Sequence, residues 1–154
     1  MKNVFSVLLV SIMSLFSSCT KDRITGSGTI KSEDRFIKNF TQVSMAGSTD
    51  VTVVKGAVFN VNVKGYSNLL PYFETNVVNG TLELGFDEHV RVIHSNIEVI
   101  VTVPVLNGLS MAGSGNIRSA GDFTGNNNFR VEIAGSGNIN IEDGDALNFS
   151  ASIF

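Results

Sequence analysis

Two nearly identical stretches decide the fold of this 154-residue chain: Met111-Ala112-Gly113-Ser114-Gly115-Asn116-Ile117 and Ile133-Ala134-Gly135-Ser136-Gly137-Asn138-Ile139. Looser copies begin at Gly26 (Gly-Ser-Gly-Thr-Ile) and at Gly47 (Gly-Ser-Thr-Asp-Val). The steps between the first glycines of the four copies are 21, 66 and 22, and 66 is three times 22. A structural unit of about 22 residues, repeated along the chain, accounts for all three steps.

The copies are flanked by short segments in which apolar and polar residues alternate. Residues 129–133, 138–142 and 51–53 all have this period of two, which is typical of a half-buried strand. Beyond residue 18, no segment has a sustained helical period. We therefore expect an all-β domain with almost no helix.

The repeated motif suits a sharp corner between two strands. Glycine adopts positive φ without steric cost, and asparagine tolerates the left-handed region better than most residues. If units stack at the strand spacing of about 4.8 Å, small residues let the backbones approach closely, and stacked Asn amides form a hydrogen-bonded ladder. The predicted corner residues are Gly26, Gly28, Gly47, Gly113, Gly115, Asn116, Gly135, Gly137 and Asn138.

Two folds fit a strand-rich unit of this length. A parallel β-helix would use one unit per coil, whereas a β-meander would use one unit per antiparallel pair. Identical corners favour the solenoid-like β-helix, because stacking like on like gains most from identical residues, and the crossover rule makes it right-handed. An Asn79-Gly80 dipeptide within 73–86 predicts an antiparallel hairpin, and 97–103 predicts a further strand.

The start of the chain predicts export and lipid attachment. Lys2 precedes an apolar stretch over 4–16, which is shorter than the roughly 20 residues that span a bilayer. Phe16-Ser17-Ser18 before Cys19, the only cysteine, resembles the lipobox of bacterial lipoproteins. The alternatives are a buried N-terminal helix and a buried thiol. We expect a signal peptide over 1–18, a lipidated Cys19 with a tether over 19–25, and a domain over 26–154.

The expected location is the outer membrane, with the lipid anchor making the membrane a partner. Lys21-Asp22 resembles the surface-export signal of Bacteroidetes lipoproteins, although Arg23 stands where a second acidic residue is usual. The domain would therefore face either the cell surface or the periplasm.

The repeated motif also resembles a known family. The recurrence of Gly-Ser-Gly-Asn-Ile at this spacing, the stretch Phe40–Ser48 with Asp50-Val51, and the stretch Val61–Tyr72 together resemble the GIN domain of autotransporter adhesin heads. The resemblance covers residues 26–154 and implies a parallel β-helix-like domain at the bacterial envelope. Members usually have more repeats, whereas this chain stops at Phe154, so we expect a domain truncated at its C-terminus.

Several kinds of chemistry are not expected. A net charge of −3 argues against nucleic-acid binding. His89 and His94 would lie on opposite faces of a strand, and Asp143 and Asp145 fit a solvated turn better than a calcium loop. The glycines lack the Lys-Ser/Thr of a phosphate loop, and no serine has a nucleophile-elbow context. We expect no enzyme activity, no cofactor and no metal.

Three functions remain. The leading hypothesis is an envelope lipoprotein whose adhesin-like domain binds a surface glycan or protein, through the flat strand ladder or the loops between 86 and 96. The second is a structural or assembly role, in which exposed coil edges pair with other envelope proteins. The third is a polysaccharide-active β-helix enzyme, which the few and dispersed basic residues disfavour.

Overall fold

The computed structural model describes residues 21–121, 123, 129–142 and 149–153. These residues form strands, connecting loops and one short 3₁₀ helix, η1 (Leu70–Tyr72), so the expected all-β class is confirmed. The first sheet contains β3 (Gln42–Gly47), β6 (Phe73–Val78), β7 (Thr81–Phe86), β10 (Gly108–Gly113), β12 (Phe129–Gly135) and β14 (Phe149–Ile153). The second contains β2 (Ile30–Arg35), β4 (Asp50–Lys55), β5 (Asn60–Tyr66), β9 (Glu98–Val103), β11 (Asn116–Ala120) and β13 (Asn138–Ile141).

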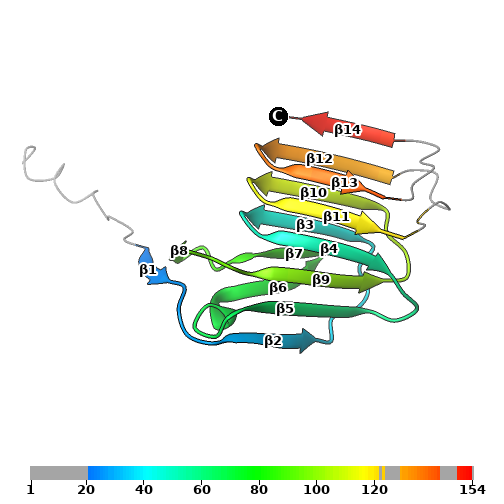
Figure 1. The fold of residues 1–154 in the computed structure, drawn as a ribbon. Coiled ribbons are helices and arrows are strands. Elements are labelled where there is room, and N and C mark those ends of the chain that lie inside the picture. Colours follow the sequence, from blue (N-terminus) through cyan, green and yellow to red (C-terminus); the bar gives the residue numbers. More distant parts are fainter. Residues whose placement is uncertain (1–20, 122, 124–128, 143–148, 154) are drawn as a thin grey trace, which may run out of the picture.

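The two sheets are stacked face to face and are mixed, with mainly parallel pairing (Figure 1). The strand order is β14-β12-β10-β3-β7-β6 in the first sheet and β13-β11-β4-β9-β5-β2 in the second. The pairs β2–β5, β5–β9 and β6–β7 are antiparallel, and the other pairs are parallel. Antiparallel pairing is therefore confined to the N-terminal half of the stack.

One sequence repeat corresponds to one strand in each sheet. Strands β10, β11, β12 and β13 alternate between the sheets, so Gly113 pairs with Gly135 in the first and Asn116 with Asn138 in the second. The chain thus returns to the same place after one repeat, as the spacing predicts.

The long interval from Gly47 to Gly113 is different, and here the prediction of three stacked units is wrong. Gly47 pairs directly with Gly113, so the two corners are immediate neighbours. The chain between them is used by β4, β5, η1, β6, β7, β8 and β9, and four of these strands pair antiparallel with a neighbour. The numerical coincidence of 66 with three times 22 has no structural counterpart.

The predicted hairpin is confirmed, since β6 and β7 pair antiparallel from Phe73–Phe86 to Val78–Thr81. Its turn residues Asn79 and Gly80 have φ of 49° and 77°, the left-handed conformation that a two-residue hairpin turn requires. The strand predicted over 97–103 is also present, as β9.

The hydrophobic core lies between the sheets. Alternation places Val43 and Met45 of β3, and Val51 and Val53 of β4, inside at no more than 1% exposure. Each such side chain contributes about 1.5–3 kcal/mol on burial. The core also contains Phe40, Val61, Val63, Leu69, Leu70, Phe73, Leu82, Leu84, Ile97, Val99, Val101, Val103, Leu106, Leu109, Met111, Ile117, Phe129 and Val131.

A small third sheet joins the N-terminal segment to the body. Strand β1 (Asp22–Thr25) pairs parallel with β8 (Val90–Ile93), so part of the segment predicted as a tether is a paired strand. The Asn68 side chain accepts from Ser27 N and donates to Thr25 O, both at 2.9 Å. These bonds attach the residues after β1 to the loop before η1.

Candidate binding groove

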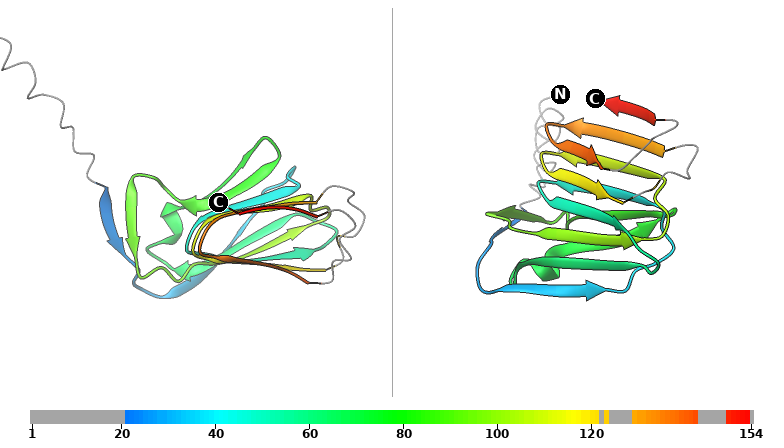
Figure 2. Two further views of the ribbon diagram at one scale, coloured as in Figure 1. Left: turned by 90° about the horizontal axis from the view of Figure 1, so that it is seen from above. Right: turned by 45° about the vertical axis from the view of Figure 1, so that its right-hand side comes forward.

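The outer face of the first sheet is hollowed beside the β6–β7 hairpin. The hollow is a groove of about 290 Å³, close to the lower end of small-molecule sites, which begin near ~300 Å³. Its floor consists of Gln42 and Ser44 from β3 and of Gly108 and Ser110 from β10. Figure 2 (left) shows the hairpin turned away from the direction of β10 and β12, whereas β7 itself stays paired with β3.

Two walls flank this floor. The hairpin supplies one, with Val78, Asn79, Thr81 and Glu83, and β12 supplies the other, with Arg130 and Glu132. The walls and floor therefore present hydroxyl, amide, carboxylate and guanidinium groups, all with hydrogen-bonding capacity.

Strand register arranges the polar groups in rows across the strands. Ser44 pairs with Glu83 on one side and with Ser110 on the other, and Ser110 pairs with Glu132. Three strand spacings of about 4.8 Å make this row about 14 Å long. The two hydroxyls thus lie in the middle of the row, with a carboxylate at each end.

A parallel row contains the glycine of the floor. Gly108 pairs with Gln42 and with Arg130, and its missing side chain leaves the floor open between them. A Cβ at this position would lie 2.9 Å from the Arg130 carbonyl oxygen, a distance that real Cβ atoms do not adopt. Replacement of this glycine would therefore push β10 and β12 apart.

The hairpin wall is held in place by its own turn. The carbonyl oxygen of Gly80 accepts hydrogen bonds from the backbone N–H groups of Thr41, at 2.9 Å, and Gln42, at 3.3 Å. The turn is thus fastened to the start of β3, at the edge of the groove floor.

The charged side chains of the groove differ in whether they have an ionic partner. Arg130 donates a charge-assisted hydrogen bond to Glu132 on the same strand. Glu83 is exposed and makes no ion pair or side-chain hydrogen bond with any residue that the structure describes. With one ion pair internally neutralised, the groove has the negative charge of a single free carboxylate.

The predicted corner glycines are brought together in a stack at one end of the strands. Gly113 and Gly135 have φ of 144° and 127°, and a Cβ on either would overlap the carbonyl of the glycine one unit earlier, Gly47 or Gly113. The N–H groups of Ser114 and Ser136 donate to those same carbonyls at 3.0 Å. The close approach that excludes a side chain is thus the one that makes the hydrogen bond.

The second glycine of each motif packs against the backbone of the preceding unit. A Cβ on Gly115 would overlap the carbonyl oxygen of Thr49, and one on Gly137 would overlap the carbonyl oxygen of Gly115. Met45 Cε and Met111 Cε are also close, at 2.7 and 2.6 Å, but they are the ends of flexible side chains that can move. The backbone carbonyl of the preceding unit therefore explains the glycine that follows the serine.

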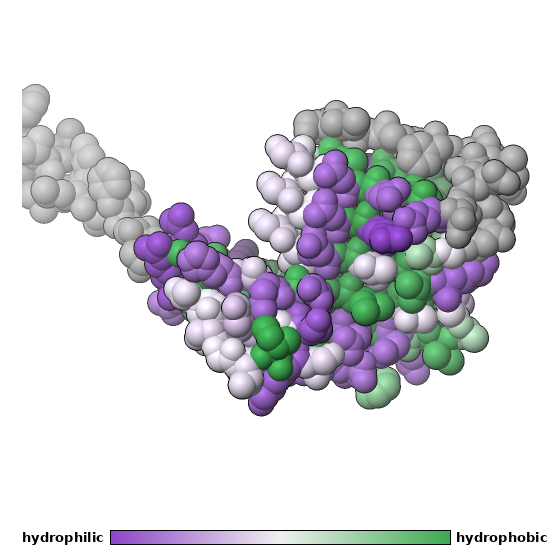
Figure 3. Space-filling view, in the orientation of Figure 1, coloured by the Kyte–Doolittle hydropathy of each residue, from purple (hydrophilic) through white to green (hydrophobic). Residues whose placement is uncertain are grey.

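The predicted amide ladder runs along the second sheet, with an aspartate at its start. Asn138 Nδ2 donates to Asn116 Oδ1 at 3.3 Å, and Asn116 Nδ2 donates to Asp50 Oδ1 at 2.8 Å. Figure 3 shows hydrophilic residues gathered in a column at the corner end of β13, β11 and β4. The ladder is exposed, and the Oδ1 atom of its last amide, Asn138, accepts no hydrogen bond from the residues that the structure describes.

Gly26 and Gly28 lie elsewhere, outside the stacked corners. The strand after them, β2, pairs antiparallel with β5, and Gly26 N donates to Ile93 O at 2.8 Å. A Cβ on Gly26 would overlap the His94 carbonyl, and one on Gly28 would approach Ser67 Oγ at 2.8 Å. Close packing therefore also requires glycine here, but against the loops around 67 and 94.

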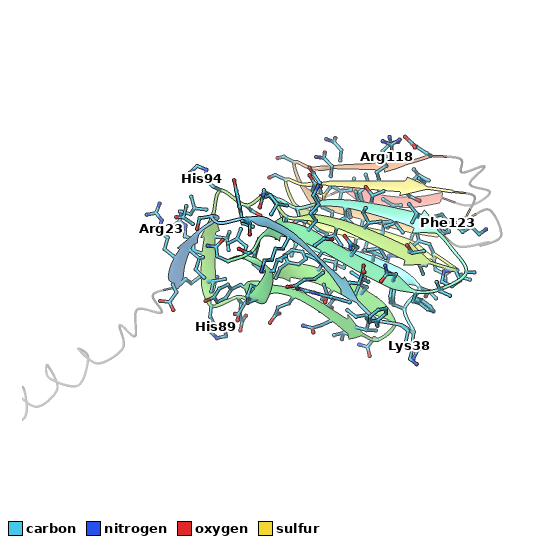
Figure 4. All side chains as sticks on the ribbon, turned by 60° about the horizontal axis from the view of Figure 1, so that its bottom comes forward. Arg23, Lys38, His89, His94, Arg118 and Phe123 are labelled. Atoms are coloured by element: carbon cyan, nitrogen blue, oxygen red, sulfur yellow. The ribbon has the colours of Figure 1, made fainter. Side chains whose placement is uncertain are left out.

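The loops between 86 and 96, predicted as an alternative binding region, contain one ionic cluster. His89 Nδ1 lies 2.8 Å from Asp87 Oδ1, which also accepts the His89 backbone N–H at 2.8 Å. The hydrogen bond with Asp87, then its charge and that of Glu88, raise the pKa of His89. His89 and His94 lie at opposite ends of β8, well apart (Figure 4).

Further expectations concern metals, membranes and the termini. Over the described residues, no three His, Cys, Asp or Glu side chains gather as a metal site would require. Within the same ranges, no helix has the length and apolar character to cross a membrane. Cys19, the signal peptide over 1–18, and Asp143 and Asp145 lie outside the described residues.

Residues 39–153 match the protein family described as "Putative auto-transporter adhesin, head GIN domain". The chain belongs to this GIN domain family. The match begins after Gly26 and Gly28, in agreement with their position outside the stacked corners.

Solved structures share the GIN domain fold at low sequence identity. A putative adhesin from Bacteroides fragilis NCTC 9343 has a TM-score of 0.70 at 21% identity, over 84% of this chain and 58% of that one. A putative adhesin from Parabacteroides merdae ATCC 43184 gives 0.67 at 18%, over 73% and 47%. A putative lipid binding protein from Parabacteroides distasonis ATCC 8503 gives 0.68 at 23%, over 77% and 51%.

This GIN domain therefore spans about half the length of the structures it resembles. Among curated proteins, none matches the chain.

The groove of this GIN domain was not foreseen beyond the general expectation of a flat ladder. Its residues lie at the polar positions of alternating strands, and such positions also occur in any solvated sheet face. The one distinctive signal is Gly108, because the residues at the equivalent position of the neighbouring strands, Gln42 and Arg130, both have long polar side chains.

Proposed function

We propose that this GIN domain is a non-catalytic, adhesin-like binding domain at the bacterial cell envelope, and that the groove on its first sheet holds the ligand. The observation that carries the proposal is the row Glu83, Ser44, Ser110 and Glu132, which presents four polar side chains across four neighbouring strands. A concave polar surface on a rigid scaffold is what a recognition site requires.

Rigidity supports this choice of surface. Strands β3 and β10 are internal strands with a hydrogen-bonded neighbour on each side, and their inward residues Val43, Met45, Leu109 and Met111 are buried. Their outward side chains are consequently held in place before a ligand arrives, which lowers the entropic cost of binding.

We further infer that the alternating strands form a right-handed β-helix. Strands β10 to β14 alternate between the two sheets with parallel pairing in each, and parallel crossovers are right-handed in about 98% of cases. In such a coil the groove face and the corner stack extend with each added unit. A crystal structure of the chain with the connections between the sheets traced would decide the handedness.

The envelope location rests on the N-terminal segment. In this proposal residues 1–18 are removed and Cys19 is lipidated, so that the protein is anchored to the outer membrane. Replacement of Cys19 by Ala should release the protein from washed membranes, and mass spectrometry of the mature N-terminus should find the acyl chains. Recovery of Cys19→Ala in the membrane fraction would contradict the anchor.

Protease treatment and adhesion assays on intact cells test the binding role. Cells that express the full chain should lose it on protease treatment and should adhere to other cell surfaces more than cells without it. Ser110→Tyr, which fills the groove floor, should abolish the difference. Thr52→Tyr, at an outward position of β4 in the second sheet, is the matched control and should retain adhesion. Full protease protection, or equal adhesion with and without the chain, would refute the proposal.

A further inference from the structure

The groove has a chemistry that selects among ligand classes, and this inference rests on the proposed function. We propose that it binds a neutral, hydroxyl-rich saccharide chain that lies across the strands of the first sheet. Three independent observations converge on this ligand: the backbone is unavailable, the lining lacks an apolar anchor pocket, and the charges disfavour ions.

The backbone of the groove floor cannot recognise a peptide. An extended peptide commonly binds by adding a strand to an open sheet edge, where unpaired N–H and C=O groups give affinity. The floor strands β3 and β10 pair with β7 and β12 on their outer sides and with each other between. Recognition by the groove floor is therefore restricted to side chains.

The side chains of the groove suit hydroxyl groups rather than apolar anchors. Protein partners usually insert a Trp, Tyr or Arg into a desolvated pocket. Here the floor is formed by the hydroxyls of Ser44 and Ser110 and the amide of Gln42, which both donate and accept. A sugar hydroxyl also donates and accepts, so it can use every group of this floor.

The charges of the groove argue against an anionic ligand. Arg130 is the cation of the lining, and the carboxylate of Glu132, to which it donates a hydrogen bond, compensates its charge. Glu83 is free, and a free carboxylate repels an acidic sugar but accepts hydrogen bonds from a hydroxyl. A cationic ligand would gain an attraction at Glu83, but this side chain is exposed, so solvent and salt screen that attraction. The floor itself is uncharged and therefore favours a neutral ligand.

The row also fixes the orientation of the chain. Polar side chains recur at the strand spacing from Glu83 to Glu132, across the strands rather than along them. A saccharide that lies across β7, β3, β10 and β12 meets a polar group at each step. Affinity should consequently rise with oligosaccharide length and then level off once the row is filled.

The test uses the full-length chain, purified in detergent, and calorimetric titration with soluble oligosaccharides. The probes are neutral gluco-, manno- and galacto-oligosaccharides of increasing length, with oligogalacturonate as the acidic probe and chitosan oligomers as the cationic probe. We expect at least one neutral series to bind, with an affinity that levels off with length and changes little with salt. Tighter binding of the acidic or cationic probe, or no binding of any neutral series, would overturn the inference.

Two variants locate the binding. Glu83→Gln removes the charge but preserves the shape, and should weaken neutral binding about tenfold, since hydrogen bonds to a charged group are the strong ones. Ser110→Tyr should abolish binding, and Thr52→Tyr on the second sheet should not. Circular dichroism of each variant confirms that it is folded. Unchanged binding by a folded Ser110→Tyr would place the saccharide elsewhere and overturn the assignment.

Failure of this inference is distinguishable from failure of the proposed function. If cells adhere through the chain, Ser110→Tyr abolishes adhesion, and excess neutral oligosaccharide has no effect, then the ligand is of another class while the binding role stands. If the purified chain binds neutral oligosaccharides but cells with and without it adhere equally, the saccharide assignment stands and the adhesin-like role fails.

Discussion

Gly113 packs directly against the carbonyl group of Gly47, although most strands of the N-terminal half lie between the two glycines in sequence. A Cβ on Gly113 would overlap that carbonyl, whereas a Cβ on Gly47 would have nothing within 4 Å. Both residues have positive φ, of 144° and 103°. The pair therefore separates the two reasons for which a chain needs glycine, namely backbone conformation and close approach.

Alanine at the two positions should differ strongly. Gly47→Ala meets only the conformational cost of positive φ, about 1–2 kcal/mol. Gly113→Ala meets that cost and must also push two corners apart, which breaks the Ser114 N–H bond to the Gly47 carbonyl, so we expect a loss of about 3 kcal/mol or more. Urea denaturation of both variants measures the difference. Equal losses would mean that the stack relaxes at no cost.

The polar ladder predicts a substitution that stabilises. Asp50 accepts from Asn116 and lies in register with Glu98 of β9, a like-charged neighbour about 4.8 Å away across the sheet. Like charges directly opposite each other are destabilising. The ion pair of Glu98 with Lys64, at 3.1 Å, offsets this repulsion only in part, because both of its side chains are more than half exposed. Asp50→Asn removes what remains and still accepts the Asn116 amide, so it should raise the free energy of unfolding by at most a few tenths of a kcal/mol.

Asp50→Ala is the control for the ladder. It also removes the repulsion but leaves the Asn116 amide without its acceptor, and a typical hydrogen bond contributes about 1 kcal/mol. Asp50→Asn should consequently be more stable than Asp50→Ala at every salt concentration. The gain of Asp50→Asn over the native chain should shrink as salt is added, because the two carboxylates are exposed.

The corner could be predicted because each of its residues contacts its own copy. Asn116 lies beside Asn138 and Gly113 beside Gly135. The motif therefore predicts the turn, and its regular spacing predicts which residues stack on one another. The Gly26 copy has the same letters, but its surroundings are the loops around 67 and 94, which a local motif cannot specify. Sequence similarity alone does not distinguish a stacked corner from a loop packed against another loop.

The groove was beyond prediction for a different reason. Ser44 and Glu83 become neighbours through parallel pairing of β3 with β7, after the chain has passed through the second sheet and the hairpin. The wall then depends on the angle between the hairpin and the strands β10 and β12 of the same sheet, which follows from sheet curvature and from packing beneath the hairpin. Phe73 and Phe86 at the base of the hairpin are in edge-to-face contact at 5.2 Å, and such contacts have no short-range signature.

A buried hydroxyl in the core gives a further prediction. Ser119 of β11 is fully buried, and its Oγ has no hydrogen-bond partner among the residues that the structure describes. Its neighbours in register are Val53 of β4 and Ile141 of β13, so the hydroxyl occupies an apolar row. Removing an unsatisfied buried polar group recovers part of a desolvation cost of about 1–3 kcal/mol. Ser119→Ala should therefore stabilise the domain by about 1 kcal/mol.

Thermal and urea denaturation check this expectation, with Ser44→Ala as the control. Ser44 is partly exposed on the outer face of β3, so its hydroxyl is solvated and its loss should change stability by less than about 0.5 kcal/mol. Destabilisation by Ser119→Ala would show that the hydroxyl has a partner in solution, such as a buried water.

Arg35 secures the N-terminal end of the core. Its guanidinium donates to the carbonyl oxygens of Phe73, at 2.5 Å, and Leu70, at 3.0 Å, and so joins β2 to η1 and β6. The side chain is only 19% exposed. Lysine has one nitrogen and cannot reproduce this fork, so Arg35→Lys should lose about 2 kcal/mol, within the range for hydrogen bonds to charged groups. Lys31→Arg, on exposed β2, should be neutral by the same urea measurement.

The Asp87–His89 contact predicts a pH dependence. Hydrogen bonding to Asp87 raises the pKa of His89, and hydrogen bonds from the His89 backbone and ring lower the pKa of Asp87. A histidine whose pKa is raised by folding stabilises the folded state fully at pH values below the pKa of the unfolded chain, and this stabilisation is lost as the pH rises through the pKa of the folded state. An aspartate whose pKa is lowered by folding stabilises the folded state fully at pH values above the pKa of the unfolded chain, and this stabilisation is lost as the pH falls through the pKa of the folded state. The contact is therefore strongest at mildly acidic pH, between the two folded pKa values.

Titration of the His89 ring by NMR measures this directly, since Asp87→Asn removes the charge and should lower the pKa of His89. The backbone of His89 also accepts a hydrogen bond from Asp22 N at 3.1 Å, so the loop supports the start of β1. Hydrogen exchange at β1 should consequently be slowest in the same mildly acidic window, once intrinsic exchange rates are removed. The Asp87→Asn variant should lose this pH dependence. If β1 protection varies with pH equally in both proteins, the contact has no part in holding β1.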